Sequence, residues 1–155
     1  MATVSWTDAG DTTITTSAPN FYTLSNTVNC ATVTSDTDYT GANGDIIQCL
    51  SIPAGTFVSR VILDITTEQT AATDTVTIDV GDGDDTDGWM DGVDGETAAV
   101  LLSSTGTWET AQSPAFGLSG KYYASADTID VKVITSTHDM VDDLVFKITA
   151  FCTNV

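Results

Sequence analysis

The sequence predicts an all-β fold: an antiparallel two-sheet β-sandwich, with the jelly roll as one form it could take, and an extended N-terminal segment. β-Branched residues dominate, with 29 Thr, 14 Val and 10 Ile among 155 residues, and such side chains favour strands. Several segments alternate apolar and polar residues, which is the pattern of a strand with one buried face. The chain has only three Lys, one Arg and three Glu, so it lacks the residues that usually cover exposed helix surfaces.

The clearest strand signals begin after residue 44. A mostly apolar run there ends at Pro53-Ala54-Gly55, which is a turn signal. The predicted strands are Asp45–Ile52, Thr56–Thr67, Asp74–Val80, Thr128–Thr135 and Leu144–Cys152, with Gly120–Ala124 leading into the fourth. Counting weaker segments, about eight short strands are separated by turns rich in Gly and Asp, which is typical of a sandwich.

The weaker segments receive less definite assignments. Thr66–Thr73 is polar and predicts a hairpin connection, and Glu96–Ser103 is compatible with a short helix or a strand. Asp11–Thr16 and Thr27–Thr34 are candidate early strands.

The alternation within the clear strands identifies the residues that face the core. In Asp74–Val80, for example, the apolar side chains occupy every second position and therefore lie on one face of the sheet. The predicted core consists of Val61, Leu63, Ile65, Val76, Ile78, Val80, Ile129, Val131, Val133, Phe146 and Ile148.

Residues 1–44 are weakly patterned and rich in Thr, Ser, Asn and Asp. We expect a single domain in which 1–44 is an extended, partly packed arm and 45–155 is the sandwich. Aromatic residues and Met are enriched at protein interfaces. The candidate interface residues are Trp6, Phe21, Tyr22 and Tyr39 of the arm and Trp89 and Met90 of a later loop. For the last two, the alternative is that they fold back to close the end of the sandwich.

The net charge is −18, from 22 acidic against four basic residues. The basic residues are scattered, so no patch is available to neutralise phosphates, and nucleic acid is excluded as a partner. An anionic membrane surface is excluded for the same reason. Divalent cations are the one class of ligand that this charge favours.

Acidic residues concentrate in the Gly-rich segment Gly81–Gly95. Calcium binds six to eight oxygen atoms, which clustered carboxylates can supply. The candidate metal ligands are Asp82, Asp84, Asp85, Asp87 and Asp91. The EF-hand pattern does not fit, because aligning Gly88 as its glycine places Gly83 at the first ligand position. The alternative is a solvated turn without a metal, and no other cofactor is indicated.

No catalytic constellation is visible, so the chain is predicted not to be an enzyme. His138 is the one histidine and lies in a polar, turn-like segment, and no nucleophile-elbow, phosphate-loop or dinucleotide-binding sequence is present. Cys30, Cys49 and Cys152 have no metal-ligand or redox spacing. We expect buried thiols, with one disulfide or metal ligation as the alternatives.

The N-terminal sequence has no basic region followed by an apolar stretch, so no signal peptide is expected. We expect synthesis in a cytoplasm.

Three stretches carry a resemblance. Ile52-Pro53-Ala54-Gly55-Thr56 leads into the long strand, and Thr77–Gly83 runs on to Asp87-Gly88-Trp89-Met90-Asp91-Gly92-Val93. Gly120-Lys121-Tyr122-Tyr123 then precedes Ala126–Val131. In this order they resemble small virion proteins of tailed bacteriophages, and most of all capsid decoration, or cement, proteins.

The resemblance implies a homotrimer that binds the major capsid protein on the outer surface of the head and stabilises the capsid lattice. Another virion component, of the tail, neck or fibres, is the first alternative. A calcium-dependent or carbohydrate-binding β-sandwich module is the second.

Overall fold

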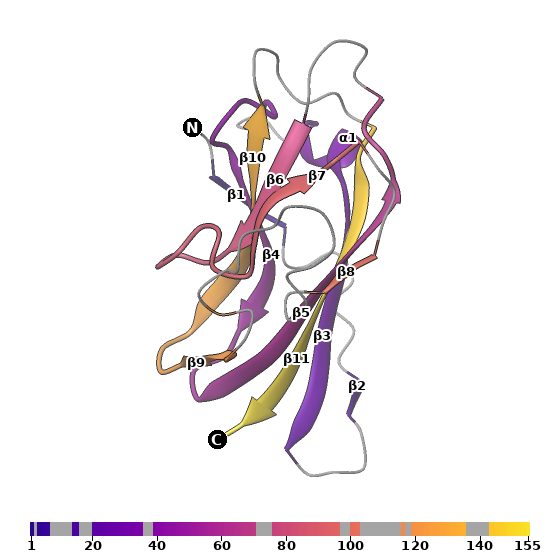
Figure 1. Ribbon diagram of the computed structural model, residues 1–155. Coiled ribbons are helices and arrows are strands. Elements are labelled where there is room, and N and C mark those ends of the chain that lie inside the picture. Colours follow the sequence, from indigo (N-terminus) through magenta and orange to yellow (C-terminus); the bar gives the residue numbers. More distant parts are fainter. Residues whose placement is uncertain are drawn as a thin grey trace.

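A computed structural model shows two β-sheets packed face to face as a sandwich (Figure 1). It describes residues 1, 3–6, 14–15, 20–35, 39–70, 76–96, 100–102, 116, 119–135 and 143–155. The predicted all-β sandwich is confirmed. Within these residues, the one helix is α1 (Cys30–Val33), of four residues, and no helix is long and apolar enough to cross a membrane.

The first sheet has the strand order β1-β4-β10-β6-β7. Its strands are β1 (Thr3–Ser5), β4 (Ile46–Ile52), β10 (Asp127–Thr135), β6 (Val76–Gly81) and β7 (Met90–Asp94). All neighbours are antiparallel except β1 and β4, which pair in parallel. The parallel pair departs from the antiparallel expectation, and it involves only the three residues of the edge strand β1.

The second sheet has the strand order β2-β3-β11-β5-β8, and β9 also pairs with β5. Its strands are β2 (Ile14–Thr15), β3 (Phe21–Asn29), β11 (Val145–Asn154), β5 (Thr56–Thr67), β8 (Val100–Leu102) and β9 (Lys121–Tyr123). The long strands β3, β11 and β5 form its centre and run side by side (Figure 1).

The strand pairing is that of a jelly roll. Eight strands pair in a nested order along the chain. The outermost pair is β3 with β11, followed by β4 with β10, β5 with β8 and β6 with β7. This nesting distributes four strands to each sheet, as in jelly rolls.

The core between the sheets contains all eleven residues predicted from the alternation, each at most 2% exposed. It also contains residues that the pattern did not identify, because they lie in segments with little alternation. These include Val4, Leu24, Val28, Val33, Tyr39 and Trp89. The three cysteines are buried thiols in this core, as expected, and burial raises the pKa of Cys49 well above its usual value.

The described part of 1–44 belongs to the sandwich. Strand β3 pairs with β11 over nine consecutive positions, and β1 extends the first sheet. Asn29 ends β3 and caps α1, its side chain accepting a hydrogen bond from the Ala31 N–H at 3.0 Å. The expected strand Thr27–Thr34 is therefore wrong in its second half, because the asparagine cap starts a helical turn there.

Two connections also differ from expectation, and in a third the structure selects one of the two alternatives. Thr66–Thr73 does not form a hairpin, because β5 and β6 belong to different sheets. The segment Gly81–Gly95 contains the strand β7, since Met90 and Val93 pack into the core. In Glu96–Ser103, residues 100–102 form the strand β8 rather than a helix.

Candidate functional site

The acidic segment begins with a tight turn around Asp82, directly after β6. The Asp82 N–H donates to the Asp85 carbonyl at 2.9 Å. One carboxylate oxygen, Oδ1, accepts from the backbone N–H groups of Asp84 and Asp85 at 3.0 and 3.2 Å. Gly81 is required here because a Cβ would lie 2.1 Å from the Asp85 carbonyl oxygen. The turn is thus an Asp-stabilised local structure.

The second carboxylate oxygen of Asp82 joins the turn to β9. Oδ2 accepts from Lys121 Nζ at 2.7 Å and from the Tyr123 hydroxyl at 2.8 Å. Asp82 is completely buried, so its charge is compensated by these contacts. Burial lowers the pKa of Lys121, but its hydrogen bonds to Asp82 and Asp84 outweigh this and leave the pKa raised. Burial, with the Asp82 contact, raises the pKa of Tyr123, which keeps the hydroxyl protonated as a donor.

An aromatic cluster covers this polar network. Trp89 Nε1 donates to the Tyr123 hydroxyl at 3.3 Å, and the rings of Trp89 and Phe116 meet edge to face with centroids 5.6 Å apart. Lys121 Nζ lies 4.5 Å from the Phe116 ring centroid, a cation–π distance. Gly88 leaves room for this packing, because a Cβ there would lie 2.2 Å from Phe116.

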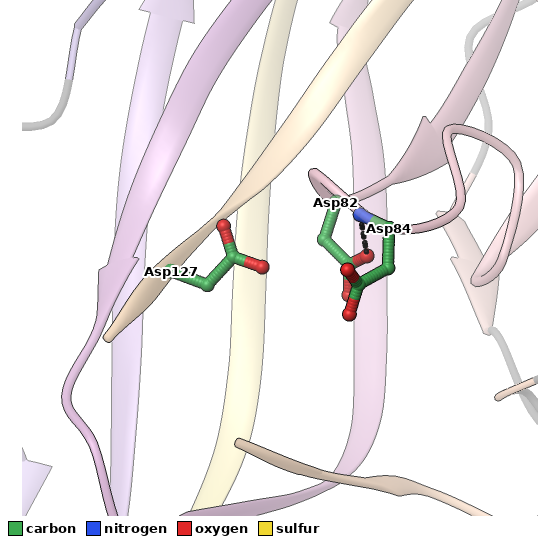
Figure 2. A group of neighbouring side chains, drawn as sticks. All are labelled: Asp82, Asp84 and Asp127. Carbon is green, nitrogen blue, oxygen red and sulfur yellow. Dashed lines mark hydrogen bonds between the residues drawn. The ribbon is translucent and has the colours of Figure 1, made fainter. Parts of the chain in front are cut away.

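The structure brings together two of the five predicted metal ligands. Asp82 and Asp84 lie beside Asp127 at the start of β10 (Figure 2), with one carboxylate oxygen from each within 4.8 Å of the others. Lys121 contacts both Asp82 and Asp84, so its ammonium group already offsets one of the two negative charges of this pair. Among the described residues, Asp85, Asp87 and Asp91 join no such group. The arrangement is that of a buried ion-pair network that anchors a loop.

Sequence reasoning missed Asp127, Lys121 and Tyr123. They lie about 40 residues from Asp82 along the chain, with Lys121 at a separation of 39 and Tyr123 at 41. Gly120-Lys121-Tyr122-Tyr123 is a conspicuous sequence, but no local pattern indicates that it faces the acidic segment.

Two further acids are buried in the first sheet. Burial raises the pKa of Asp79, while the Gly92 N–H, 3.0 Å from its Oδ1, opposes the rise. Burial also raises the pKa of Asp130 to about 6, with Thr128 opposing the rise and the charges of Asp127 and Asp82 adding to it. Asp130 Oδ1 has no hydrogen-bond partner among the described residues. Both carboxylates are therefore costly to ionise in the folded state.

The predicted interface residues occupy different environments. Tyr39, Trp89 and Met90 are buried within the chain, which favours the alternative given for Trp89 and Met90, packing into the sandwich. Trp6 and Tyr22 pack partly against the core. Of the six, Phe21 remains the most exposed, at 58%. His138 lies outside the described residues.

Comparisons with solved structures show that the fold occurs in bacteriophage capsids. The chain is similar to a chain in the capsid of Ralstonia phage GP4, with 18% identity, 99% of each chain covered and a TM-score of 0.61. It is also similar to a chain of the cyanophage Pam1 capsid, with 16% identity, 92% and 94% covered and a TM-score of 0.59. A third is the acidic stable capsid structure of Helicobacter pylori bacteriophage KHP30, with 13% identity, 93% of each chain covered and a TM-score of 0.54.

No protein-family model matches the chain, and no curated protein matches it in sequence. At these identities the likeness concerns the fold. The chain shares a full-length jelly-roll fold with chains of three phage capsids.

Proposed function

We propose that the protein is a phage capsid decoration protein that binds the outside of the head and stabilises the capsid lattice. The observation that carries this proposal is the full-length correspondence with a chain of a phage capsid, which covers 99% of both chains.

The charge supports the outer surface as the location. At −18 the protein repels packaged DNA, whereas a charged, Thr-rich surface suits contact with solvent. The buried groups support a structural role, because Asp82, Lys121 and Tyr123 are engaged with one another and anchor a loop. We propose that the protein is not an enzyme and that its partners are the major capsid protein and two further copies of itself, in a homotrimer.

The proposal is tested by adding purified protein back to heads that lack it. Cosedimentation of protein with heads measures binding, and the temperature of DNA release measures stabilisation. We expect saturable binding and a higher release temperature. An unrelated acidic protein of similar size is the control for nonspecific charge effects. Absence of binding to heads, or binding to isolated tails instead, would overturn the proposal.

A further inference from the structure

The outer face of the second sheet carries a row of aromatic side chains. The strand registers place Phe21 of β3 opposite Thr153 of β11, Thr153 opposite Phe57 of β5, and Phe57 opposite Tyr122 of β9. Phe151 lies two residues before Thr153 and therefore points to the same face. We call Phe21, Phe57, Tyr122 and Phe151 the aromatic row.

The row is directed away from the core. In β11 the inward residues Phe146, Ile148, Ala150 and Cys152 are buried, and the residues between them are partly or fully exposed. Phe21, Tyr122 and Phe151 are 58%, 52% and 39% exposed. Neighbouring strands are about 4.8 Å apart, so the row spans about 15 Å across four strands. Grouped exposed aromatic side chains of this kind mark interaction surfaces.

The same face differs in charge from the rest of the molecule. The charged side chains on the outward positions of the described parts of β3, β11, β5 and β9 are Arg60, Lys147 and Asp64. Two cations and one anion give these described outward positions a net charge of +1, whereas the chain carries −18. Arg60 and Lys147 are exposed, and neither forms an ion pair with a carboxylate of the described residues.

The other two basic residues are engaged elsewhere. Lys121 contacts Asp82 and Asp84, and Lys132 lies 4.0 Å from Asp79. The outer face of the second sheet is thus where the chain presents positive charge to a partner.

The opposite charge is concentrated on the other sheet, at the edge formed by β7 and the turn that precedes it (Figure 1). Asp84 has an 80% exposed side chain, and Asp85, Asp87, Asp91 and Asp94 follow within ten residues. Asp94 is exposed, and Asp85, Asp87 and Asp91 are partly exposed. We call Asp84–Asp94 the acidic edge.

We propose that the outer face of the second sheet docks the acidic edge of a second copy of this chain. Arg60 and Lys147 would meet carboxylates of the acidic edge, while the aromatic row would be removed from water between the two copies. Because the two surfaces differ, the contact is head to tail, which generates closed rings when the rotation permits. The inference rests on the proposed function, since a capsid holds many copies of the chain close together.

Charge reversal tests the contact on the purified full-length protein. Sedimentation velocity over a range of micromolar concentrations, at an ionic strength of about 0.15 M where screening acts within about 8 Å, measures self-association. We expect the wild type to associate and two double variants, R60E/K147E and D87K/D91K, each to be monomeric. The first changes the net charge from −18 to −22 and the second to −14, so a shared loss of association cannot come from net charge.

Mixing the two variants provides the rescue. The acidic face of R60E/K147E then meets the basic edge of D87K/D91K, and the unchanged surfaces of the two chains match as well. The mixture should therefore associate into one-to-one pairs and alternating assemblies, although a ring of three would contain one mismatched contact. The single substitution Phe151→Ser leaves the inward core residues unchanged. It should weaken self-association at least tenfold relative to the wild type. Thermal melts confirm that each variant is folded.

A wild type that stays monomeric at every concentration overturns the inference, as does a mixture that associates no more than its components. If the monomeric wild type still binds heads and Phe151→Ser abolishes that binding, the face contacts the capsid shell. This inference and the proposed homotrimer then fail, while the proposed binding to the head stands. If charge reversal and rescue behave as expected but the protein does not bind heads, the proposed function fails and the contact between copies stands.

Discussion

At the scale of single residues, buried charge dominates the behaviour of this molecule. Asp82 and Asp130 are both buried acids, but their surroundings differ. Asp82 accepts hydrogen bonds from two backbone N–H groups, from Lys121 and from Tyr123. Asp130 has one carboxylate oxygen without a partner among the described residues. The negative charge of Asp82 is therefore stabilised by its contacts, whereas the negative charge of Asp130 at neutral pH lowers the stability of the fold.

We expect Asp82→Asn to destabilise the fold by about 2–4 kcal/mol, because it leaves the half-buried Lys121 against a neutral amide and removes an acceptor from Tyr123. Chemical denaturation at pH 7 measures the change. Asp84→Asn is the matched control: Asp84 contacts the same Lys121, but its side chain is 80% exposed, so little loss is expected. Equal effects of the two substitutions would contradict the role given to Asp82.

We expect Asp130→Asn to stabilise the protein at pH 7.5 and to have no such effect near pH 4. The pKa of Asp130 rises from 3.8 to about 6 on folding, so the folded state binds more protons than the unfolded state between these values. Stability from this group is thus present below about pH 4 and lost as the pH rises through about 6.

Denaturation of wild type and variant from pH 4 to pH 7.5 gives this dependence. Asp64→Asn on the outer face of the second sheet changes the net charge equally and serves as the control. A stability difference that does not vary with pH would refute the assignment to Asp130.

At the scale of elements, β3 connects the described part of segment 1–44 to both sheets. Its inward residues Leu24, Asn26 and Val28 are buried, and Asn26 Nδ2 donates to the Trp6 and Cys49 carbonyl oxygens at 2.6 and 3.0 Å. These bonds connect β3, in the second sheet, with the first sheet at β4. The strand therefore contributes both to the pairing within its own sheet and to the contact between sheets.

We expect a chain lacking residues 1–44 to be unfolded or aggregated, because removal of β3 leaves β11 with an unpaired edge and exposes core side chains. Circular dichroism and light scattering of the purified fragment provide the measurement. Deletion of residues 1–5 is the control, since it removes only the edge strand β1, and that chain should fold with a lower Tm. A folded, monomeric 45–155 fragment would restore the division at residue 44.

At the scale of the whole molecule, the charge of −18 opposes the compact state. Repulsion among exposed carboxylates extends about 30 Å at 0.01 M salt and about 8 Å at 0.15 M. Stability should therefore depend on ionic strength. Within the part of the chain that the structure describes, the group placed to give an effect specific to calcium is Asp82, Asp84 and Asp127.

We expect the Tm to rise as NaCl is increased from 0.01 M to 0.15 M, because screening weakens the repulsion. Millimolar calcium at matched ionic strength should add nothing, since Lys121 already contacts Asp82 and Asp84. Differential scanning calorimetry measures the Tm with calcium, with magnesium and with a chelator. A rise in Tm with calcium alone would mean that the ion displaces Lys121 and that the predicted metal site exists.

The fold class and the inward face of each clear strand could be predicted from the amino-acid sequence alone. Alternation has a period of two and can be read within a single strand, which is why all eleven predicted core residues, Ile78 and Val131 among them, are buried. The inward face of β3 was not predicted, because the buried Asn26 stands between Leu24 and Val28 and interrupts the row of apolar positions.

Which strands pair, and which side chains contact one another, could not be predicted from the sequence and is seen in the three-dimensional fold. The nesting of β3 with β11 joins segments more than 100 residues apart, and Asp82 meets Lys121 and Tyr123 across about 40 residues. The aromatic row likewise depends on the registers of four strands that are distant in the chain. Such contacts depend on how the two sheets pack against a shared core. The pattern within one strand does not indicate which distant strand will lie beside it, so these contacts could not be predicted.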